Sequence, residues 1–313
     1  MTHSDLAPWP LAVFDWGTSN LRAYAVQEDG TILGRVAGRG AKQTEREEFS
    51  RAYDRTLMRL RRKYGCEQAL LVGMVGSNLG WVDVDMCTAP QTRATVQARL
   101  VPVAGTGAHI VPGVSAKSIG GFPDMMRGEE VQVFGALALA ARDDALLCLP
   151  GTHSKWVTCE QGAICRISTA MTGEIFDLLC HASVLKGHVT SELGGTGLAG
   201  FDDGIEAAKS NLGVSLLAFS TRPRALLSGA VNPVDGRGYL SGVLIGSEIL
   251  SMQQASGAQD VLIVGEPELA RFYARAAGAL NMTARVIDGA AAIAAGAAAI
   301  HRARLAAVSG VNS

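Results

Sequence analysis

Two short glycine-containing segments follow apolar runs and carry residues that can bind phosphate. The first is Gly17-Thr18-Ser19, after the run 11–14, and the second is Gly151-Thr152-His153, after the run 145–149. A glycine turn exposes backbone N–H groups to an anion, and Thr and Ser hydroxyls add donors. Lys155 adds a positive charge near the second turn, although strand-borne lysines are usually exposed. Facing one another across a cleft, the turns would clamp a polyphosphate; the alternative is two ordinary hairpin turns.

Asp15 and Asp124 are the two carboxylates whose positions could serve metal binding or catalysis. Asp15 directly follows an apolar strand, where an acidic side chain needs a partner. Mg²⁺ prefers oxygen ligands and keeps several waters, so one carboxylate plus phosphate oxygens makes an ordinary site. The alternative is that Asp15 only caps the turn at Gly17. Asp124 lies between Pro123 and a helix that we expect to begin near Met125, where it would also be a good N-cap.

Two arginines could bind an organic acid. Arg22 lies two residues beyond Asn20 on the same face of an expected strand, and Arg127 lies three residues after Asp124 on the expected helix. The guanidinium fork can donate two hydrogen bonds to one carboxylate, so either side chain suits an acidic substrate. Arg127 could instead pair with a neighbouring carboxylate such as Glu130.

The glycine-rich segment from Gly73 to Trp81 has the side chains of a sugar-binding loop. The aromatic face of Trp81 can pack on the C–H surface of a sugar, and Ser77 and Asn78 can hydrogen-bond to its hydroxyls. The alternative is a Trp that only packs in a glycine-rich turn.

The opening of the chain predicts an antiparallel meander that recurs later. We expect its strands at residues 11–14, 21–27 and 31–36, with an Asp29-Gly30 turn between the last two. Residues 145–168 show the same order, with Gly151-Thr152 in the place of Gly17-Thr18. Each half of the protein is therefore expected to begin with the same three-stranded unit.

Most of the remaining elements alternate between helix and strand. Apolar spacing predicts helices at 45–64, 172–185, 239–254, 267–280 and about 289–305, the last capped by Asp288. Short buried strands are expected at 68–73, 260–265 and 283–287. This order is typical of parallel strands covered by helices. Residues 86–114 have weak periodicity and are expected to be irregular and to line a cleft.

The composition narrows the class of protein. The chain has 313 residues, a net charge of -1, 48% hydrophobic and 18% charged residues, which is typical of a globular protein without the basic surface that binds nucleic acid. The apolar tract 290–300 is too short to cross a membrane, and no export signal is visible. Six cysteines without a Cys-x-x-Cys pair favour reduced, buried thiols in the cytoplasm over a zinc site.

Five motifs, in order along the chain, resemble the 2-dehydro-3-deoxygalactonokinase family. They are the segments Phe14–Tyr24, Gly73–Trp81, Pro123–Glu130, Leu149–Trp156 and Met171–Glu174. The resemblance implies an α/β fold of the sugar kinase, Hsp70 and actin superfamily, with two RNase H-like lobes around an ATP cleft. We expect the lobes at 1–142 and 143–313, with the final helix able to pack back on the first. One departure from the family pattern is Val82-Asp83-Val84-Asp85, where a Glu and a Pro often follow the Gly-Trp.

The resemblance also implies roles for the candidate residues. Asp15 would hold Mg²⁺ through water, Asp124 would be the general base, and Gly265, which ends the strand 261–264, would lie at the adenosine; for Gly265 the alternative is an ordinary strand-to-helix turn. The ATP phosphates would be bound by Gly17, Thr18, Ser19, Gly151, Thr152, His153 and Lys155. The substrate would contact Asn20, Arg22, Ser77, Asn78, Trp81 and Arg127.

The activity implied is ATP- and Mg²⁺-dependent phosphorylation of 2-dehydro-3-deoxy-D-galactonate at its 6-hydroxyl, a step of galactonate catabolism. A kinase of a related sugar or sugar acid and a non-catalytic sugar-acid sensor on the same fold are the alternatives. A phosphatase or ATPase of the superfamily would leave the segments 73–81 and 123–130 unexplained. The expected partners are a small sugar acid and ATP, in a cytoplasmic protein able to form a homodimer, with no nucleic acid and no membrane.

Overall fold

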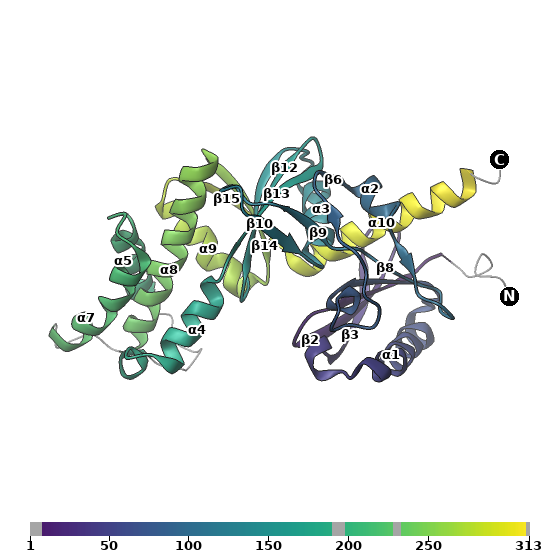
Figure 1. Ribbon diagram of the computed structural model, residues 1–313, viewed down its shortest axis with the longest axis horizontal. Coiled ribbons are helices and arrows are strands. Elements are labelled where there is room, and N and C mark those ends of the chain that lie inside the picture. Colours follow the sequence, from purple (N-terminus) through teal and green to yellow (C-terminus); the bar gives the residue numbers. More distant parts are fainter. Residues whose placement is uncertain (1–7, 190–197, 228–232, 311–313) are drawn as a thin grey trace. The chain divides into compact units, whose positions relative to one another are not determined.

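The computed structural model describes residues 8–189, 198–227 and 233–310 (Figure 1). The chain forms two compact units. The first comprises Met1–Ala145, Val157–Ser168 and Ile287–Ser313, and the second comprises Leu146–Trp156 and Thr169–Val286. Each unit is described below by itself.

The first unit contains a six-stranded sheet in the order β3-β2-β1-β4-β8-β7. The expected meander is confirmed: β1 (Leu11–Trp16), β2 (Asn20–Val26) and β3 (Ile32–Arg39) are antiparallel neighbours, and Gly30 takes a positive φ of 91° in the turn. The strand β4 (Ala69–Gly73) runs parallel to β1, and β8 runs parallel to β4. The last two strands are β7 (Val101–Pro102) and β8 (Ala108–Ile110).

One helix covers the buried face of this meander. The helix α1 (Phe49–Tyr64) follows two short 3-10 turns, Ala41–Gln43 and Arg46–Glu48, so it begins four residues later than its apolar spacing predicts. Its buried rings pack on those of β1: the Phe14 and Tyr53 centroids lie 5.2 Å apart, and those of Trp16 and Phe49 lie 4.9 Å apart. This aromatic core holds the end of β1, and hence the first glycine turn, in place.

Residues 86–114 are more regular than their sequence predicts. They contain β5 (Cys87–Thr88), β6 (Gln91–Thr92), α2 (Arg93–Gln97), β7 and β8. These elements are short and pair with distant strands: β5 runs parallel to β9 (Val114–Lys117), and β6 pairs with β13 (Ala163–Ala170). The expectation of irregular structure was wrong here, because pairing to remote strands leaves no periodic signal in a two-residue strand.

Two helices of the first unit, distant in sequence, pack against one another. The helix α3 (Glu129–Ala140) lies along α10 (Gly289–Gly310). Glycines allow the close approach, since a Cβ on Gly135 would collide with the carbonyl of Ala292. The predicted cap of α10 is confirmed, because Asp288 Oδ1 accepts the N–H of Ala291 at 2.8 Å.

The second unit contains β14, most of β11 and β15 and the start of β12, and these strands are neighbours in the order β12-β11-β14-β15. These strands are β11 (Ala145–Leu149), β12 (Ser154–Glu160), β14 (Asp260–Gly265) and β15 (Thr283–Asp288), and β11 runs parallel to β14 as expected. Its helices are α4 (Thr172–Ala182), α5 (Leu198–Ala208), α6 (Val214–Phe219), α7 (Thr221–Leu227), α8 (Pro233–Ser256) and α9 (Pro267–Ala279), with one 3-10 turn at Lys186–His188.

The packing of α5 against α8 depends on small residues. A Cβ on Gly204 would collide with the carbonyl of Tyr239, and a Cβ on Gly242 would collide with that of Phe201. The two backbones therefore lie in direct contact over much of their length, and Figure 1 shows α4, α5, α7 and α8 gathered together.

Two expectations about the chain as a whole can be compared with the structure. All six cysteines are free thiols, and all but Cys165 are buried, as predicted. Within the described residues, no helix combines the length and the apolar character that a membrane crossing requires.

Candidate active site

The second glycine turn and the start of α4 form one rigid assembly. The turn Gly151–His153 joins the buried end of β11 to Ser154, and the N–H of Glu174 donates to the carbonyl of Thr152 at 3.0 Å. A Cβ on Gly173 would lie 2.5 Å from the carbonyl oxygen of Gly151, so only glycine permits this contact. A further link joins His153 Nε2 to Glu174 Oε2 at 2.5 Å.

Lys155 lies just beyond this turn, and its ammonium is already engaged. Its Nζ donates to the hydroxyl of Thr169 at 2.7 Å, from a half-buried position. A role in binding phosphate stays a prediction for this side chain, and it would require the ammonium to leave Thr169.

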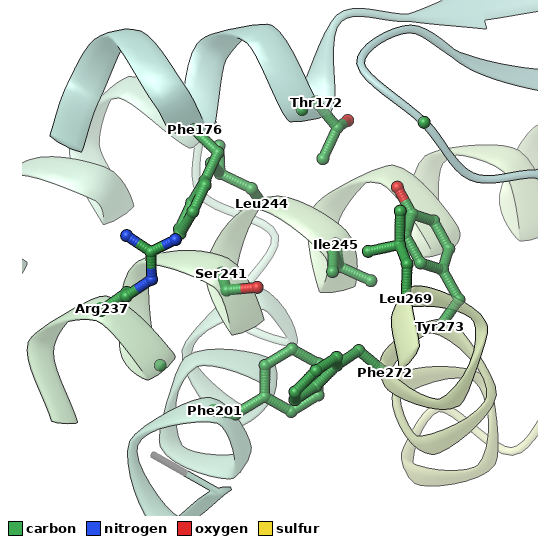
Figure 2. Close-up of a pocket in the computed structure, with 13 residues that line it drawn as sticks. Thr172, Phe176, Phe201, Arg237, Ser241, Leu244, Ile245, Leu269, Phe272 and Tyr273 are labelled. Carbon is green, nitrogen blue, oxygen red and sulfur yellow. The ribbon is translucent and has the colours of Figure 1, made fainter. Parts of the chain in front are cut away.

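A cavity of about 230 Å³ opens beside the same turn (Figure 2). Gly151 and Gly173 line it, and its walls are rich in aromatic side chains, namely Phe176, Phe201, Phe272 and Tyr273. The few polar groups in the lining include Thr172, Arg237 and Ser241. Small-molecule sites typically combine mostly apolar walls with a few placed polar groups, and this cavity has that character.

The arrangement in the cavity suits a flat heteroaromatic ring joined to an anionic chain. Figure 2 shows Arg237 beside Phe176, with its Cζ 4.8 Å from the ring centroid, and the rings of Phe201 and Phe272 have centroids 5.1 Å apart. Aromatic and guanidinium faces stack on a planar base. The backbone of the Gly151 turn at the other side of the lining can receive phosphate. The cavity can therefore hold a nucleotide.

Gly265 is not part of the cavity lining, but it lies close to the glycine turn. A Cβ on Gly265 would be 3.7 Å from Pro150 Cδ. The helix that follows it, α9, supplies Leu269, Phe272 and Tyr273 to the lining. Sequence reasoning missed these three residues, although their spacing of three and four along a helix is a signal that could have pointed to them.

A buried carboxylate, also missed from the sequence, lies next to the cavity. Glu248 on α8 is 8% exposed and accepts hydrogen bonds from Trp156 Nε1 at 2.6 Å and from the Tyr273 hydroxyl at 2.9 Å. Burial raises the pKa of Glu248 above its usual value, although these hydrogen bonds favour the charged form. The periodicity of α8 offers no signal that distinguishes this Glu from a solvent-facing one.

The first glycine turn lies at the end of β1 in the first unit. Its backbone is held by hydrogen bonds from the segment after β3: Ala41 N donates to the carbonyl of Gly17 at 2.9 Å, and Lys42 N donates to that of Thr18 at 3.0 Å. Ser19 and Asn20 are exposed. The turn is therefore preorganised, with its polar side chains at the surface.

Asp15 and Arg22 lie side by side at this turn. They are opposite one another in the β1–β2 register, and Arg22 Nη1 is 3.9 Å from Asp15 Oδ2. The Asp15 side chain is only 23% exposed. Within the described residues, no cluster of three or more His, Cys, Asp or Glu side chains could hold a metal ion. A single carboxylate of this kind fits an ion such as Mg²⁺ that takes its other ligands from phosphate and water.

The expected sugar loop includes the 3-10 turn Met74–Gly76, and its side chains have structural contacts. Ser77 Oγ donates to the carbonyl of Met74 at 2.7 Å, and Trp81 packs on Tyr53 with ring centroids 5.4 Å apart. Asn78 is exposed. The packing alternative for Trp81 therefore has direct support, while substrate contacts by Ser77, Asn78 and Trp81 stay predictions.

The helix expected to begin near Met125 begins four residues later, and the expectation was wrong. Asp124 lies in β10 (Pro123–Met126), opposite Ala116 of β9, and its Oδ1 accepts the N–H of Met125 at 2.7 Å. Asp124 is therefore not a helix N-cap. A strand forms here instead of a helix because Met126 is buried in the β9–β10 pairing. Gly128, at a φ of 113°, then turns the chain into α3.

The start of α3 brings a cation and a buried acid close together without pairing them. Arg127 Nη2 donates to the carbonyl of Val84 at 2.9 Å, while its buried Nη1 has no hydrogen-bond partner. Glu130 is fully buried; its Oε2 accepts the N–H of Gly128 at 2.7 Å, and its Oε1 has no partner. No hydrogen bond joins the unpartnered Arg127 Nη1 to the unpartnered Glu130 Oε1, although the charge of Arg127 acts to lower the pKa of Glu130.

Burial is also the main cause of a raised pKa at Glu130. It raises the pKa of Glu130 to about 8, and the neighbouring charge of Glu129 acts in the same direction. Buried acids with shifted pKa values and open hydrogen-bonding capacity are typical of functional sites.

The fold is shared with solved structures. The chain superimposes on component A of (R)-2-hydroxyglutaryl-CoA dehydratase from Acidaminococcus fermentans with a TM-score of 0.52 at 12% identity, covering 95% of this chain and 98% of that one, which shows the fold alone. A crystal structure from Sinorhizobium meliloti, assigned to the 2-dehydro-3-deoxygalactonokinases, matches with a TM-score of 0.83 at 31% identity, covering 94% and 98%. Fold and site together define a two-lobed α/β protein of the actin-like ATPase and sugar kinase class, as the sequence predicted.

Within that class, the family is defined by the sequence comparison. Residues 15–300 match the model of the 2-keto-3-deoxy-galactonokinase family, and the chain belongs to this family. A Rhizobium meliloti relative named probable 2-dehydro-3-deoxygalactonokinase DgoK1 is 33% identical over 93% of this chain and 96% of its own length. The Escherichia coli 2-dehydro-3-deoxygalactonokinase is 29% identical over 90% of this chain and 94% of its own.

Proposed function

We propose that this protein is an ATP-dependent kinase that phosphorylates 2-dehydro-3-deoxy-D-galactonate at its 6-hydroxyl. The family match over residues 15–300 supports the reaction. The observation that carries the nucleotide part is the aromatic cavity that includes Gly151 and the start of α4 in its lining. The base would stack among Phe176, Phe272 and Tyr273, and the phosphates would extend to the N–H groups of Gly151, Thr152 and His153.

In the first unit, Gly17, Thr18 and Ser19 are proposed to bind phosphate as well. Asp15 would hold Mg²⁺ through water, and the ion would supply neutralisation of the phosphate charge. Arg22 Nη1 lies 3.9 Å from Asp15 Oδ2, so its charge can balance that of the carboxylate before the nucleotide binds. The protein contribution is positioning, on which phosphoryl transfer mainly depends.

Two carboxylates are proposed for the general base. Asp124 follows from the family resemblance, but the helix start that supported it lies at Glu129 instead. Glu130, in the first turn of α3, is the second candidate, because its Oε1 is buried and has no partner. With a pKa of about 8, Glu130 is mostly protonated at neutral pH, so it would accept the hydroxyl proton in its ionised form, whose share grows as pH rises toward 8. Because its unpartnered oxygen could receive that proton, we expect Glu130 to be the more important of the two.

Arg127 is proposed to bind the carboxylate of the sugar acid. Its Nη1 is buried without a partner, and an unsatisfied buried donor is costly unless a ligand supplies the acceptor. The other nitrogen is held by Val84, so the guanidinium is fixed in orientation. Arg22 remains the second candidate for this contact, with Asn20, Ser77, Asn78 and Trp81 proposed around the sugar.

The reaction is tested by measuring ADP release over a panel of sugar acids. We expect ADP release that requires 2-dehydro-3-deoxy-D-galactonate and Mg²⁺, with a product phosphorylated at the 6-hydroxyl. Binding of the sugar acid without turnover would indicate a sensor, and ADP release without any sugar acid would indicate an ATPase. A preference for another substrate in the panel would assign a related sugar or sugar-acid kinase.

We further propose a cytoplasmic enzyme that forms a homodimer. The free thiols support a reducing compartment, where disulfides are rare. Sedimentation of the purified protein tests the dimer: a single species at the monomer mass would contradict it.

A further inference from the structure

A buried hydrogen-bond network lies next to the proposed nucleotide cavity, and of its members only Tyr273 has a role in the function proposed above. It joins Glu248, Trp156, Tyr273 and Ser154, all of which are buried. Trp156 Nε1 donates to Glu248 Oε1 at 2.6 Å, the Tyr273 hydroxyl donates to Glu248 Oε2 at 2.9 Å, and the hydroxyls of Ser154 and Tyr273 are 2.8 Å apart.

The chemistry of the groups sets the direction of these bonds. The indole N–H of Trp156 can only donate, so it requires an acceptor on Glu248. The single proton of Tyr273 is directed to Glu248, and its oxygen therefore accepts the proton of Ser154. The hydrogen bonds run from Ser154 through Tyr273 to Glu248. Glu248 also accepts the N–H of Trp156 at its other oxygen.

These four residues come from β12, α8 and α9, and the last two of these elements supply residues to the cavity lining. Ser154 and Trp156 stand at the start of β12, directly after the Gly151 turn, and Tyr273 lies on α9 beside Phe272. Glu248 lies on α8, three and four residues after Ile245 and Leu244, which line the cavity. Glu248 itself is not in the lining. It can therefore affect a ligand only through the residues that it holds.

We propose that Glu248 is a positioning residue of the nucleotide site: it ties Tyr273 and the start of β12 to α8 and so sets the spacing between the Gly151 turn and α9. This inference rests on the proposed function, since it takes the aromatic cavity as the ATP site. The side chain acts by its shape and its two acceptor oxygens, and its charge is not required.

Two substitutions at Glu248 distinguish the effect of its hydrogen bonds from the effect of its size. In Glu248→Gln, the amide oxygen still accepts from Trp156, and the amide nitrogen donates to Tyr273, which then donates to Ser154. Every group of this network keeps a partner, with the bond between residue 248 and Tyr273 and the bond between Tyr273 and Ser154 both reversed. In Glu248→Leu, the Trp156 donor is left buried without an acceptor, and the Tyr273 hydroxyl loses its bond to α8 and can donate only to Ser154.

The experiment measures the dissociation constant of ATP by calorimetry, and kcat and the sugar-acid KM separately, on the full-length protein. We expect Glu248→Leu to weaken ATP binding about tenfold or more, as the loss of hydrogen bonds to a buried carboxylate implies. Glu248→Gln should restore most of that loss, and Ser154→Ala should weaken ATP binding by about threefold. The sugar-acid KM should stay near its wild-type value in all three.

A matched control is available on the same helix. Tyr239→Phe removes a hydroxyl that is 2.6 Å from Ser220 Oγ, and Tyr239 does not line the cavity. We expect this variant to lose some stability and to keep the ATP affinity. If Glu248→Leu fails to fold, Ser154→Ala and Tyr273→Phe provide the comparison with Tyr239→Phe.

The proposal is overturned if the folded variants lose stability but bind ATP as tightly as the wild type, because the network would then be purely structural. A wild type that binds ATP but phosphorylates no sugar acid contradicts the proposed reaction alone, and the binding test of Glu248 still supports or refutes this inference. A wild type that binds no ATP refutes both.

Discussion

Each unit of the protein contains a buried glutamate, and the two are satisfied differently. Glu248 in the second unit accepts hydrogen bonds at both oxygens, from Trp156 and Tyr273. Glu130 in the first unit accepts one bond, from the N–H of Gly128, and its other oxygen is buried without a partner. A neighbouring guanidinium nitrogen, Arg127 Nη1, is unsatisfied as well.

The difference in hydrogen bonding indicates a structural role for one glutamate and a reactive role for the other. A buried polar group without a partner costs about 1–3 kcal/mol, and binding of a ligand or a role in a reaction is one reason for a protein to keep it. A fully satisfied network gives rigidity and a single arrangement. This difference agrees with the proposed positioning role of Glu248 at the nucleotide site and with the proposed reactive roles of Glu130 and Arg127.

The largest expected effect is a fall in kcat of the Glu130→Gln variant. Gln keeps the shape and the bond from Gly128 but does not accept the substrate proton, so kcat should fall by roughly 10²–10⁴ with little change in melting temperature. The same assay on Asp124→Asn is the control, since Asn can still accept the N–H of Met125. If Asp124→Asn has the large loss and Glu130→Gln turns over normally, the base is Asp124.

The next effect concerns the affinity for the sugar acid. Arg127→Lys replaces a fixed fork by a point charge and loses the bond to Val84. A carboxylate left without its partner in a desolvated site should cost roughly 2–5 kcal/mol of binding, seen as a raised sugar-acid KM with an unchanged ATP affinity. Arg22→Lys serves as the comparison. Equal sugar-acid KM values in both variants and the wild type would mean that another group binds the carboxylate.

Asp15→Asn should have a smaller effect, on the concentration of Mg²⁺ that the reaction requires. Removing a carboxylate that holds Mg²⁺ through water should raise the Mg²⁺ concentration needed for half-maximal rate by roughly 10–100-fold. The fold should be preserved, because the contact to Arg22 is 3.9 Å long and partly exposed. Titrating Mg²⁺ at saturating ATP measures the shift, and an unchanged titration curve would remove Asp15 from the metal site.

The smallest effect is on stability as a function of pH. Burial raises the folded-state pKa of Glu130 from 4.5 to about 8, so the folded state binds more protons than the unfolded state between these values. The free energy of unfolding should therefore fall as pH rises through this window, by up to about 1.4 kcal/mol per pH unit. Denaturant titrations at pH 5 and pH 8 should show a smaller decrease for Glu130→Gln. Glu248 contributes in the same direction to both proteins, and identical slopes would contradict a neutral buried Glu130.

Local patterns predicted much of the fold. The meander β1–β3 and the Asp288 cap of α10 follow from a turn and a capping residue within a few positions of the elements they define. The Gly17 and Gly151 turns likewise follow from an apolar strand that ends in Gly-Thr. The helix expected at Met125 shows the limit, since the N-cap signal at Asp124 was weaker than the pairing of β10 with β9.

By itself, the sequence determined where the two glycine turns lie, many of the strands and helices, and which family the chain resembles. The tertiary structure alone decided that Trp81 packs on Tyr53, that α9 supplies an aromatic wall, and that two glutamates are buried in opposite states of hydrogen bonding. The physical reason is that turns and caps depend on neighbours in the chain. Burial, the pKa of an acid and the partners of its oxygens depend on residues brought together from distant positions, as Glu248 and Trp156 are across 92 residues of sequence.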